Sequence, residues 1–278
     1  MAFHRKIALI GLGAITNHIL STLQAQNELH RVSGILDRPG RTRILRTYEY
    51  PVRVVDDLGA LLGMQPDIVL ECAGHNAIRE YGETILRSGM DLVVASVGAL
   101  ADEPLAQTLE SAANDGGQLL VPSGAVAGID GLLAARTAGL KRVTYTSSKP
   151  PAAWKDTPAE QILNLDAQSS AVAFFDGTAR KAAAQFPKNA NVGATVALAG
   201  IGLDETRVRL MTDPALNAPL GIIEAEGDFG RFRFEALAFA SPSNPKTSVL
   251  TAHSMLLAVD AGWAFCPFHF PSSGRIWA

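Results

Sequence analysis

The chain has 278 residues, and its 24 lysines and arginines against 27 aspartates and glutamates give a formal net charge of −3. Hydrophobic residues make up 47% of the chain, which is enough to bury a sizeable core and excludes a largely disordered protein. The slight acidity argues against a nucleic-acid partner, and two cysteines are too few for a disulfide scaffold or a four-thiolate metal site, so no metal is expected.

The N-terminal segment bears on where the protein resides. The apolar run before Gly11 is too short for a secretory signal peptide, which needs about 7–15 apolar residues. Nowhere does an apolar run approach the roughly 20 residues that cross a bilayer. We therefore expect a cytoplasmic protein that does not associate with a membrane.

The first 125 residues alternate short apolar runs with segments of helical periodicity. The apolar runs predict strands at residues 6–10, 32–36, 53–55, 68–71, 92–95 and 119–121. Helices are predicted at residues 14–24, 77–87 and 104–114. This alternation predicts right-handed crossovers onto a parallel sheet, which is the doubly wound α/β plan of Rossmann-like domains.

The pattern changes after Gly124 to alternating apolar and polar residues. The alternation predicts antiparallel strands at residues 142–147, 207–211, 222–226 and 231–238. Helices are predicted at residues 129–138, 178–186 and 192–199. This second part is expected to be an α+β domain.

A further helix is predicted to begin at Asn244-Pro245, because Asn is a favoured cap and Pro a favoured first helical residue. It would run to about Val259 and pack on the first domain, while residues 261–278 show no periodic pattern. We expect a dinucleotide-binding domain of residues 1–124 and 245–278, and a substrate and dimerisation domain of residues 125–244.

The strongest local signal is a glycine-rich turn between a predicted strand and a predicted helix, Gly11-Leu12-Gly13-Ala14-Ile15-Thr16. Gly11 permits the tight turn, and Gly13 lets the backbone approach a pyrophosphate at the helix N-terminus. Thr16 replaces the third glycine of the usual fingerprint, which weakens the match. The alternative is a glycine turn with no ligand.

Asp37 ends the second predicted strand, where its carboxylate could bind the adenosine ribose and would repel a 2′-phosphate. Arg38, Arg41 and Arg43 follow and could instead hold that phosphate, so NAD and NADP both stay open. A solvated basic loop is the more ordinary interpretation of these arginines.

Two further strand ends reach the carboxyl edge of the predicted sheet, where doubly wound folds bind ligands. Cys72 and Ala73 follow one strand and Ser96 follows the next, and their small side chains leave room for a ribose and a nicotinamide. His75 is more typical of a capping residue than of a catalytic one, and Cys72 is more often a core residue than a nucleophile.

A set of short motifs resembles the L-aspartate dehydrogenase family: Ala73-Gly74-His75-Asn76-Ala77, Pro122-Ser123-Gly124-Ala125, Lys149-Pro150-Pro151, Asn189-Ala190-Asn191-Val192, Asp213-Pro214 and Asn244-Pro245-Lys246-Thr247-Ser248. The resemblance spans nearly all of residues 6–258 in order. It implies a Rossmann-like domain with an α+β catalytic domain, usually in a homodimer. It also implies oxidation of L-aspartate by NAD or NADP to iminoaspartate, which gives oxaloacetate and ammonia or enters pyridine nucleotide biosynthesis.

The resemblance implies that Ala125 and Asn191 contact the cofactor, and it places Gly221 where the family has its catalytic histidine. No histidine lies between His75 and His253 in the sequence. Losing a base costs about 10²–10⁴-fold in rate but leaves cofactor binding largely intact. A non-catalytic dinucleotide sensor or pseudoenzyme is therefore the alternative function. A reductase of the dihydrodipicolinate type is less favoured, because its basic substrate motif is missing.

Dehydrogenation of a dicarboxylic amino acid needs cations for two carboxylates and an acceptor for a proton. Lys149, Lys155 and Arg180 are the basic residues near the family motifs, although each could equally be a solvated surface charge. His75 and Asp176 are the candidate substitutes for the missing base.

Overall fold

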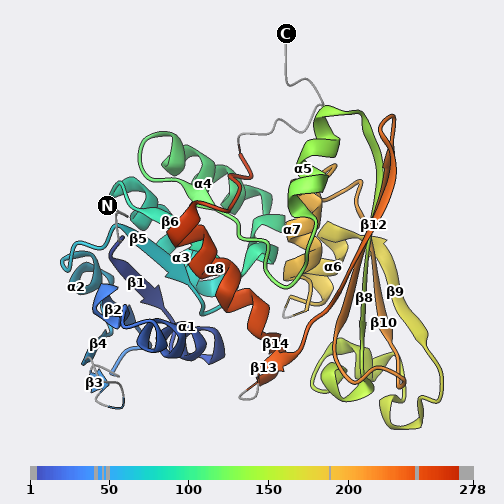
Figure 1. Ribbon diagram of the computed structural model, residues 1–278, viewed down its shortest axis with the longest axis horizontal. Helices are drawn as coiled ribbons and strands as arrows, with labels where there is room; N and C mark the ends of the chain where they lie inside the picture. The colour runs from blue at the N-terminus through green and yellow to red at the C-terminus, as the bar shows by residue number, and fades with distance from the viewer. Residues whose placement is uncertain are drawn as a thin grey trace. The chain divides into compact units, whose positions relative to one another are not determined.

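The computed structural model describes residues 5–40, 43–45, 47, 51–187, 189–241 and 244–268. The chain divides into two compact units (Figure 1). Unit 1 comprises Met1–Pro122 and Thr251–Cys266, and unit 2 comprises Ser123–Leu250 and Pro267–Ala278. The bounds at Pro122 and Leu250 lie within a few residues of the predicted division, but Pro267–Ala278 falls in unit 2, whereas the prediction placed it in the first domain.

Unit 1 contains a seven-stranded sheet in the order β3-β4-β2-β1-β5-β6-β7. Its strands are β1 (Ile7–Ile10), β2 (Val32–Leu36), β3 (Arg43–Leu45), β4 (Val52–Val55), β5 (Ile68–Glu71), β6 (Asp91–Val94) and β7 (Leu119–Leu120). All neighbours pair in parallel except β3, which is antiparallel to β4. Strand order reverses between β1 and β5, so the predicted doubly wound, Rossmann-like sheet is confirmed.

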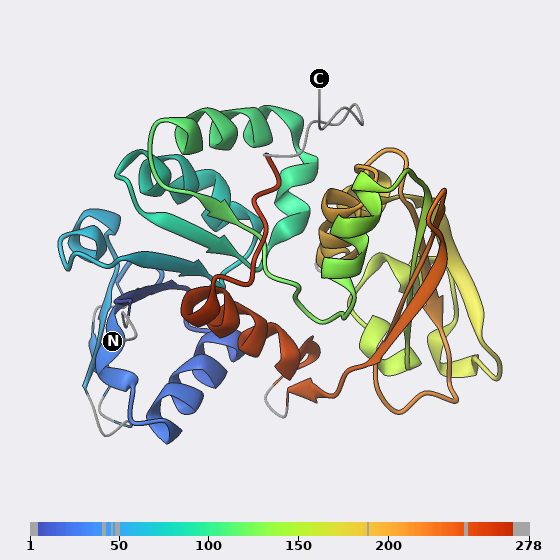
Figure 2. The ribbon, with the colours of Figure 1, turned by 45° about the horizontal axis from the view of Figure 1, so that its top comes forward.

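Helices cover both faces of this sheet, with α3 and α4 on one face and α1 and α8 on the other (Figure 2). The helices of unit 1 are α1 (Ala14–Ala25), α2 (Leu58–Leu62), α3 (His75–Arg87), α4 (Glu103–Asn114) and α8 (Val249–Ala261), with short 3-10 turns η1 (Leu29–Arg31) and η2 (Val97–Ala101). The buried core joins Ile7 and Leu9 of β1 to Leu23 of α1 and Met255 of α8. The predicted packing of the last helix on the first domain is therefore confirmed.

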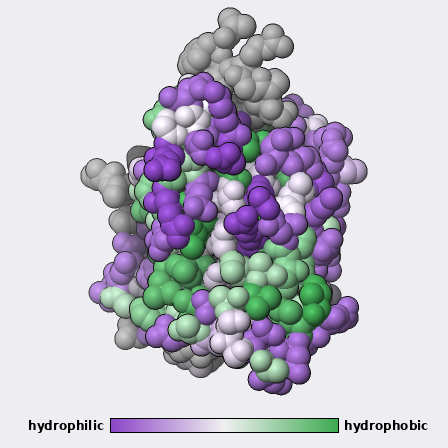
Figure 3. Space-filling view, turned by 90° about the vertical axis from the view of Figure 1, so that its right-hand side faces the viewer, coloured by the Kyte–Doolittle hydropathy of each residue, from purple (hydrophilic) through white to green (hydrophobic). Residues whose placement is uncertain are grey.

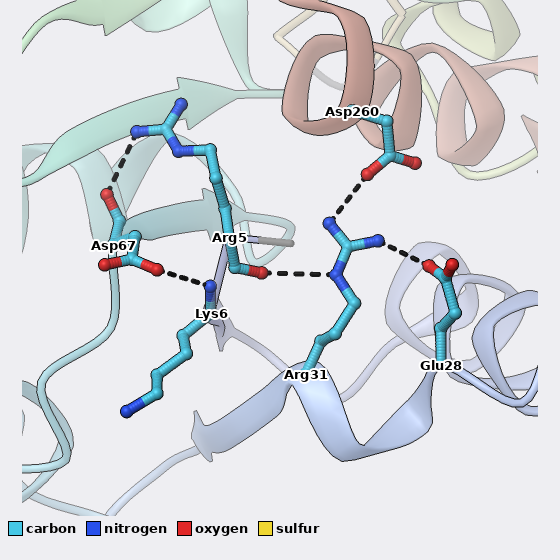
Figure 4. A network of polar contacts seen from close by, with 6 residues as sticks. All are labelled: Arg5, Lys6, Glu28, Arg31, Asp67 and Asp260. Atoms are coloured by element: carbon cyan, nitrogen blue, oxygen red, sulfur yellow. Dashed lines mark hydrogen bonds and ion pairs between the residues drawn. The ribbon is translucent and has the colours of Figure 1, made fainter. Parts of the chain in front are cut away.

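A buried arginine ties helix α8 to the start of the sheet. The guanidinium of Arg31 donates to the carboxylates of Glu28 and Asp260 at 2.6 Å each, and to the carbonyl of Arg5 at 3.2 Å (Figure 4). Arg31 is only 4% exposed, so these bonds replace the water that its charge would otherwise need. The network joins segments from opposite ends of the sequence.

The predicted helix start at Asn244 is wrong. Asn244–Ser248 forms strand β14, which pairs antiparallel with β13 (Ala240–Ser241), and the helix begins at Val249. The Asn-Pro signal favours a helix start, but pairing with β13, just before it in the chain, overrides that preference. The backbone N–H of Leu250 donates to the side-chain oxygen of Ser248 at 3.2 Å, so a serine satisfies part of this helix start instead.

Unit 2 is built on a five-stranded sheet in the order β12-β11-β8-β10-β9. Its strands are β8 (Leu140–Lys149), β9 (Val172–Thr178), β10 (Arg207–Thr212), β11 (Leu220–Gly227) and β12 (Gly230–Leu237). Helices α5 (Ile129–Thr137), α6 (Ala179–Gln185) and α7 (Asn191–Ala199) lie on one face (Figure 2), and β8 leads into 3-10 turns η3 (Pro151–Trp154), η4 (Pro158–Gln161) and η5 (Leu165–Ala167). Only β8 and β10 are parallel neighbours. The predicted α+β architecture is confirmed, although β9 was not predicted.

Charged side chains of this sheet join neighbouring strands through ion pairs. Arg207 of β10 pairs with Asp176 of β9, and Arg233 of β12 pairs with Glu224 of β11. Figure 3, which views the molecule from the right-hand side of Figure 1, shows hydrophilic residues over the upper part of that face and a band of hydrophobic residues below. The exposed apolar side chains of unit 2 are Ile162, Leu237, Phe239 and Leu250.

The segment after α8 is partly described. Phe265 forms an antiparallel bridge with Val121, through backbone hydrogen bonds of 2.8 and 3.1 Å. The segment 261–278, which shows no periodic pattern in the sequence, thus adds a bridge beside β7, and residues 269–278 lie outside the described part. Within the described residues, none of the helices has the length and apolar character that a membrane span requires.

Candidate active site

The glycine turn follows β1 at the point where the strand order of the unit 1 sheet reverses. Gly11 has a φ of +88°, which strains any other residue, and a Cβ added there would lie 2.8 Å from the Cα of Ala73. The turns after β1 and β5 therefore touch backbone to backbone. A side chain at position 11 would push them apart.

The N-terminus of α1 is open to an anion. Gly13 is its N-cap, and no described side chain caps the helix or places an acidic group in its first turn, which Ala14 and Ile15 begin. The backbone N–H groups of a first turn lack partners inside the helix and carry a partial positive charge. Thr16, where the fingerprint has a third glycine, is fully buried and donates to the Gly11 carbonyl at 2.6 Å, so it closes the turn. These residues fit a pyrophosphate.

Glu71, at the end of β5, is a buried residue of this site that the sequence analysis missed. Its carboxylate accepts hydrogen bonds from the backbone N–H groups of Ala73 and Gly74 at 2.7 Å each. It also accepts from the N–H and the hydroxyl of Ser96 at 3.0 Å each. Burial raises the pKa of Glu71, while these hydrogen bonds oppose the rise. One carboxylate thus fastens the turns after β5 and β6 to each other.

The other predicted residues of unit 1 have simpler surroundings. Burial raises the pKa of the Cys72 thiol, and its sulfur lies 3.8 Å from that of Met255, so it is no nucleophile. His75 is the first residue of α3 and partly buried. Asp37 directly follows β2, so it lies at the edge of the sheet. One of its carboxylate oxygens is 3.7 Å from a guanidinium nitrogen of Arg43. Arg41 lies outside the described residues.

In unit 2, Gly221 is the second residue of β11 and is buried. A Cβ added there would lie 3.2 Å from the hydroxyl of Tyr145 and 3.2 Å from a methyl group of Val126. Both distances are slightly shorter than an ordinary van der Waals contact. A histidine at this position would require its neighbours to move by a few tenths of an ångström.

Tyr145 of β8 lies near Gly221 and near residues that directly follow two of the motifs that resemble the family. Its hydroxyl lies against Gly221 beside Val126, the residue after Ala125, and its ring lies 3.5 Å from where a Cβ of Gly193, two residues after Asn191, would be. Burial raises the pKa of Tyr145 to about 12, so its hydroxyl stays protonated and can donate. The sequence analysis missed Tyr145, although the alternation of residues 142–147 does place it among the inward positions.

The predicted substrate cations have different surroundings. Lys149 ends β8, is partly buried, and holds its ammonium nitrogen 4.9 Å from the centre of the Trp154 ring. Burial lowers the pKa of Lys149 to about 8. The guanidinium of Arg180 instead donates two hydrogen bonds of 2.7 Å to the carboxylate of Asp204. Lys155 forms an exposed ion pair of 2.9 Å with Asp166. Of these three cations, Lys149 alone forms no ion pair with a carboxylate among the described residues.

Asp176 does not suit the role of a base. It accepts hydrogen bonds from Arg207 and Arg209, and chiefly the Arg207 bond lowers the pKa of its carboxyl group. A carboxylate held ionised by two arginines accepts a proton poorly at neutral pH. The described residues also contain no group of three or more His, Cys, Asp or Glu side chains placed to hold a metal ion.

Comparison with known proteins shows to which family this arrangement belongs. Residues 130–261 match the C-terminal domain of aspartate dehydrogenase, and residues 11–122 match the NAD binding domain of homoserine dehydrogenase. L-aspartate dehydrogenase of Ruegeria pomeroyi is 45% identical over 255 residues, which cover 91% of each chain. The chain belongs to the L-aspartate dehydrogenase family. The family resemblance predicted from the short motifs is therefore confirmed.

Further similarities agree with this assignment. L-aspartate dehydrogenase of Serratia proteamaculans is 43% identical, over 93% of this chain and 99% of the relative. The crystal structure of aspartate dehydrogenase from Thermotoga maritima superposes with a TM-score of 0.71 at 24% identity, covering 92% of this chain and 95% of that one. At that identity the superposition supports the fold.

Proposed function

We propose that this protein oxidises L-aspartate with NAD or NADP. The observation that carries the proposal is the 45% identity to an L-aspartate dehydrogenase over nine-tenths of the chain, combined with a glycine turn whose geometry fits a dinucleotide. A hydride leaves Cα of L-aspartate and a proton leaves its ammonium group, which gives iminoaspartate. Water then adds to the C=N carbon, and oxaloacetate and ammonia are released.

The proposed cofactor-binding residues come from both units. In unit 1 the open first turn of α1 would hold the pyrophosphate, and the small residues at the strand ends would leave room for the ribose and the nicotinamide. When bound, a nicotinamide dinucleotide supplies the hydride acceptor. The residues assigned to this role are Gly11, Gly13, Ala14, Ile15, Cys72, Ala73 and Ser96 in unit 1, with Ala125 and Asn191 in unit 2.

Cofactor preference is proposed to depend on Asp37. Its carboxylate stands at the end of β2, where it can accept hydrogen bonds from a ribose and would repel a 2′-phosphate. Arg43 lies within 3.7 Å and could turn instead toward a phosphate. We expect NAD to be used better than NADP, and the ratio of kcat/KM for the two dinucleotides measures this directly.

Tyr145 and Val126 are described residues that lie against Gly221, and neither is a base for the proton released from the substrate. Burial raises the pKa of Tyr145 to about 12, so its hydroxyl is protonated at neutral pH and does not serve as the base. His75, the other candidate, belongs to unit 1 and begins a helix. We therefore propose slow turnover. Lys149 is the residue we assign to the substrate, because Arg180 is already neutralised by Asp204.

Gly221 also favours a second candidate function, that of a dinucleotide-binding sensor without catalysis. The position is not an open gap, because Tyr145 and Val126 lie against it. A sensor would bind the dinucleotide through unit 1 and still leave L-aspartate unchanged.

An activity assay on the full chain separates the two functions. We expect L-aspartate to reduce NAD or NADP slowly, with no reduction by D-aspartate or L-lysine, as followed by absorbance of the reduced dinucleotide. Failure of every L-amino acid at high enzyme concentration would overturn the dehydrogenase. A thermal-shift titration with each dinucleotide then tests the sensor, since a ligand that binds the native state raises the melting temperature without turnover.

We further propose that the protein is a cytoplasmic homodimer. Both cysteines, Cys72 and Cys266, are free thiols, as expected in a reducing compartment. Leu237 and Phe239 in unit 2 are 52% and 74% exposed, and apolar side chains of this size are commonly covered by a partner. Light scattering of the purified chain tests the dimer.

A further inference from the structure

Lys149 and Thr212 occupy matching positions at the carboxyl ends of two parallel strands. They are register partners on β8 and β10. Partner residues of neighbouring parallel strands lie about 4.8 Å apart and point to the same face of the sheet. The same registration places Tyr145 beside Val208, so Lys149 and Thr212 lie on the face that carries Tyr145.

Both side chains lack a polar partner among the described residues. Thr212 is fully buried, and its hydroxyl has no hydrogen-bond partner. Lys149 forms no ion pair with any described residue, and its ammonium nitrogen lies 4.9 Å from the centre of the Trp154 ring. That ring is itself fixed, because the indole N–H donates to the carbonyl of Met211 at 2.9 Å. A cation and an unsatisfied hydroxyl thus belong to paired positions of neighbouring strands.

An unpaired ammonium and an unpaired hydroxyl are both costly away from water. The lowered pKa of Lys149 reflects the same cost. An anion between the two groups would give each a charge-assisted hydrogen bond. A bound anion would also keep Lys149 protonated, so this role differs from that of a base.

We propose that the ammonium of Lys149 and the hydroxyl of Thr212 bind one carboxylate group of a dicarboxylate substrate. This assignment rests on the proposed function. In it, one end of the β8–β10 pair in unit 2 would recognise the acid. Neither Thr212 nor the fixed Trp154 ring is among the residues that the sequence analysis assigned.

The position of Gly221 supports this subsite. Gly221 is the register partner of Ser147, two residues before Lys149 on the same strand and the same face. Diagonal neighbours of this kind lie about 7–8 Å apart. A small four-carbon acid held at Lys149 would therefore extend toward Gly221, where the family has its catalytic histidine.

Two other buried side-chain atoms without partners, in Thr206 and Asn189, do not enter the subsite. Thr206 directly precedes β10, at the end opposite to Thr212. It therefore provides a matched control, because it has the same chemistry and burial at the wrong end of the strand.

Succinate, a four-carbon diacid that lacks the amino group, is the probe. We measure its binding to the full chain by calorimetry, with and without NADH. Lys149→Met should weaken binding by about tenfold or more, and Thr212→Val by about threefold to tenfold, as expected for hydrogen bonds to a charged group. Lys141→Met, on the same strand but exposed and paired with Asp228, and Thr206→Val should leave binding unchanged.

The result that overturns the subsite is succinate binding that is absent in the wild type or unaffected by Thr212→Val and Lys149→Met. Affinity for NADH, followed by fluorescence, should not change in either variant, which shows that the chain is folded. The proposed function fails separately, if L-aspartate reduces no dinucleotide while succinate binding still depends on Lys149. Should Lys149→Met not fold, Thr212→Val against Thr206→Val decides the matter.

Discussion

The candidate sites of unit 1 and unit 2 are built in different ways. In unit 1 the site is made of backbone: Gly11 lies against Ala73, the first turn of α1 offers N–H groups, and the buried Glu71 carboxylate holds two turns together. In unit 2 it is made of side chains, with Tyr145 against Gly221 and Lys149 beside Thr212.

This difference bears on how each part tolerates change. A backbone site is shared by every protein with the same turn, and it is lost when one turn is forced out of shape. A side-chain site can lose one group while its surroundings stay packed, which is what we propose for position 221. We therefore expect dinucleotide binding and turnover to respond to different substitutions, and the predictions below test that separation.

The largest effect is expected from restoring a base at position 221. Gly221→His should raise kcat for L-aspartate, and adding Val126→Ala should raise it further, because the shorter side chain removes a contact of 3.2 Å. A general base contributes about 10²–10⁴-fold. Stopped-flow or steady-state rates of dinucleotide reduction measure the gain.

Gly221→Ala is the control for that series, because it crowds Tyr145 without adding a base. It should leave kcat low and dinucleotide affinity unchanged. If neither histidine variant gains activity although both are folded and bind NADH, the sensor becomes the favoured function.

The second effect concerns the glycine turn. Gly11→Ala combines a left-handed backbone with a clash of 2.8 Å against Ala73, so we expect NADH affinity to fall about 100-fold. Gly89→Ala has nearly the same φ, +81°, but meets nothing within 4 Å, so it carries the backbone strain without the clash. Fluorescence titration should show normal NADH binding in Gly89→Ala. Equal losses in both variants would mean that Gly11→Ala acts through general destabilisation and not through its contact with Ala73.

The comparison also explains which features the sequence could predict. Parallel strands buried on both faces are short apolar runs, so strands such as β2 and β5 were predicted with their observed bounds. The glycine turn could also be predicted, because the glycines that it requires lie within a few residues of each other in the sequence. The error at Asn244 arose where a local signal competes with pairing to β13.

The missed residues depend on contacts between distant segments. Glu71 follows an apolar run and resembles an ordinary strand end, and only the folded chain brings Ser96, 25 residues later, to its carboxylate. Tyr145 is one inward residue among several, until β11 places Gly221 against its hydroxyl. Likewise, nothing local to Thr212 indicates that it faces Lys149.

A smaller effect is expected at Glu71. Glu71→Gln keeps the shape of the side chain, but its amide group would turn one N–H toward the donors of Ala73, Gly74 or Ser96. We expect NADH affinity to fall about tenfold, through loosening of both turns. Ser96→Ala removes only the hydroxyl bond and should cost less. Unchanged affinity in Glu71→Gln would show that the turns hold their shape without this carboxylate.

The smallest effect is a pH dependence of stability caused by Lys149. Its pKa is about 8 in the folded protein, below the ordinary value of about 10.4 in an unfolded chain. Between these values the unfolded state binds more protons, so the free energy of unfolding rises with pH. Relative to Lys149→Met, in which other titrations cancel, the wild type should gain about 1 kcal/mol between about pH 7 and pH 9. Urea unfolding at several pH values measures the difference. Saturating succinate should abolish it, because a bound carboxylate restores the ammonium form, and a difference that persists would show that the anion binds elsewhere.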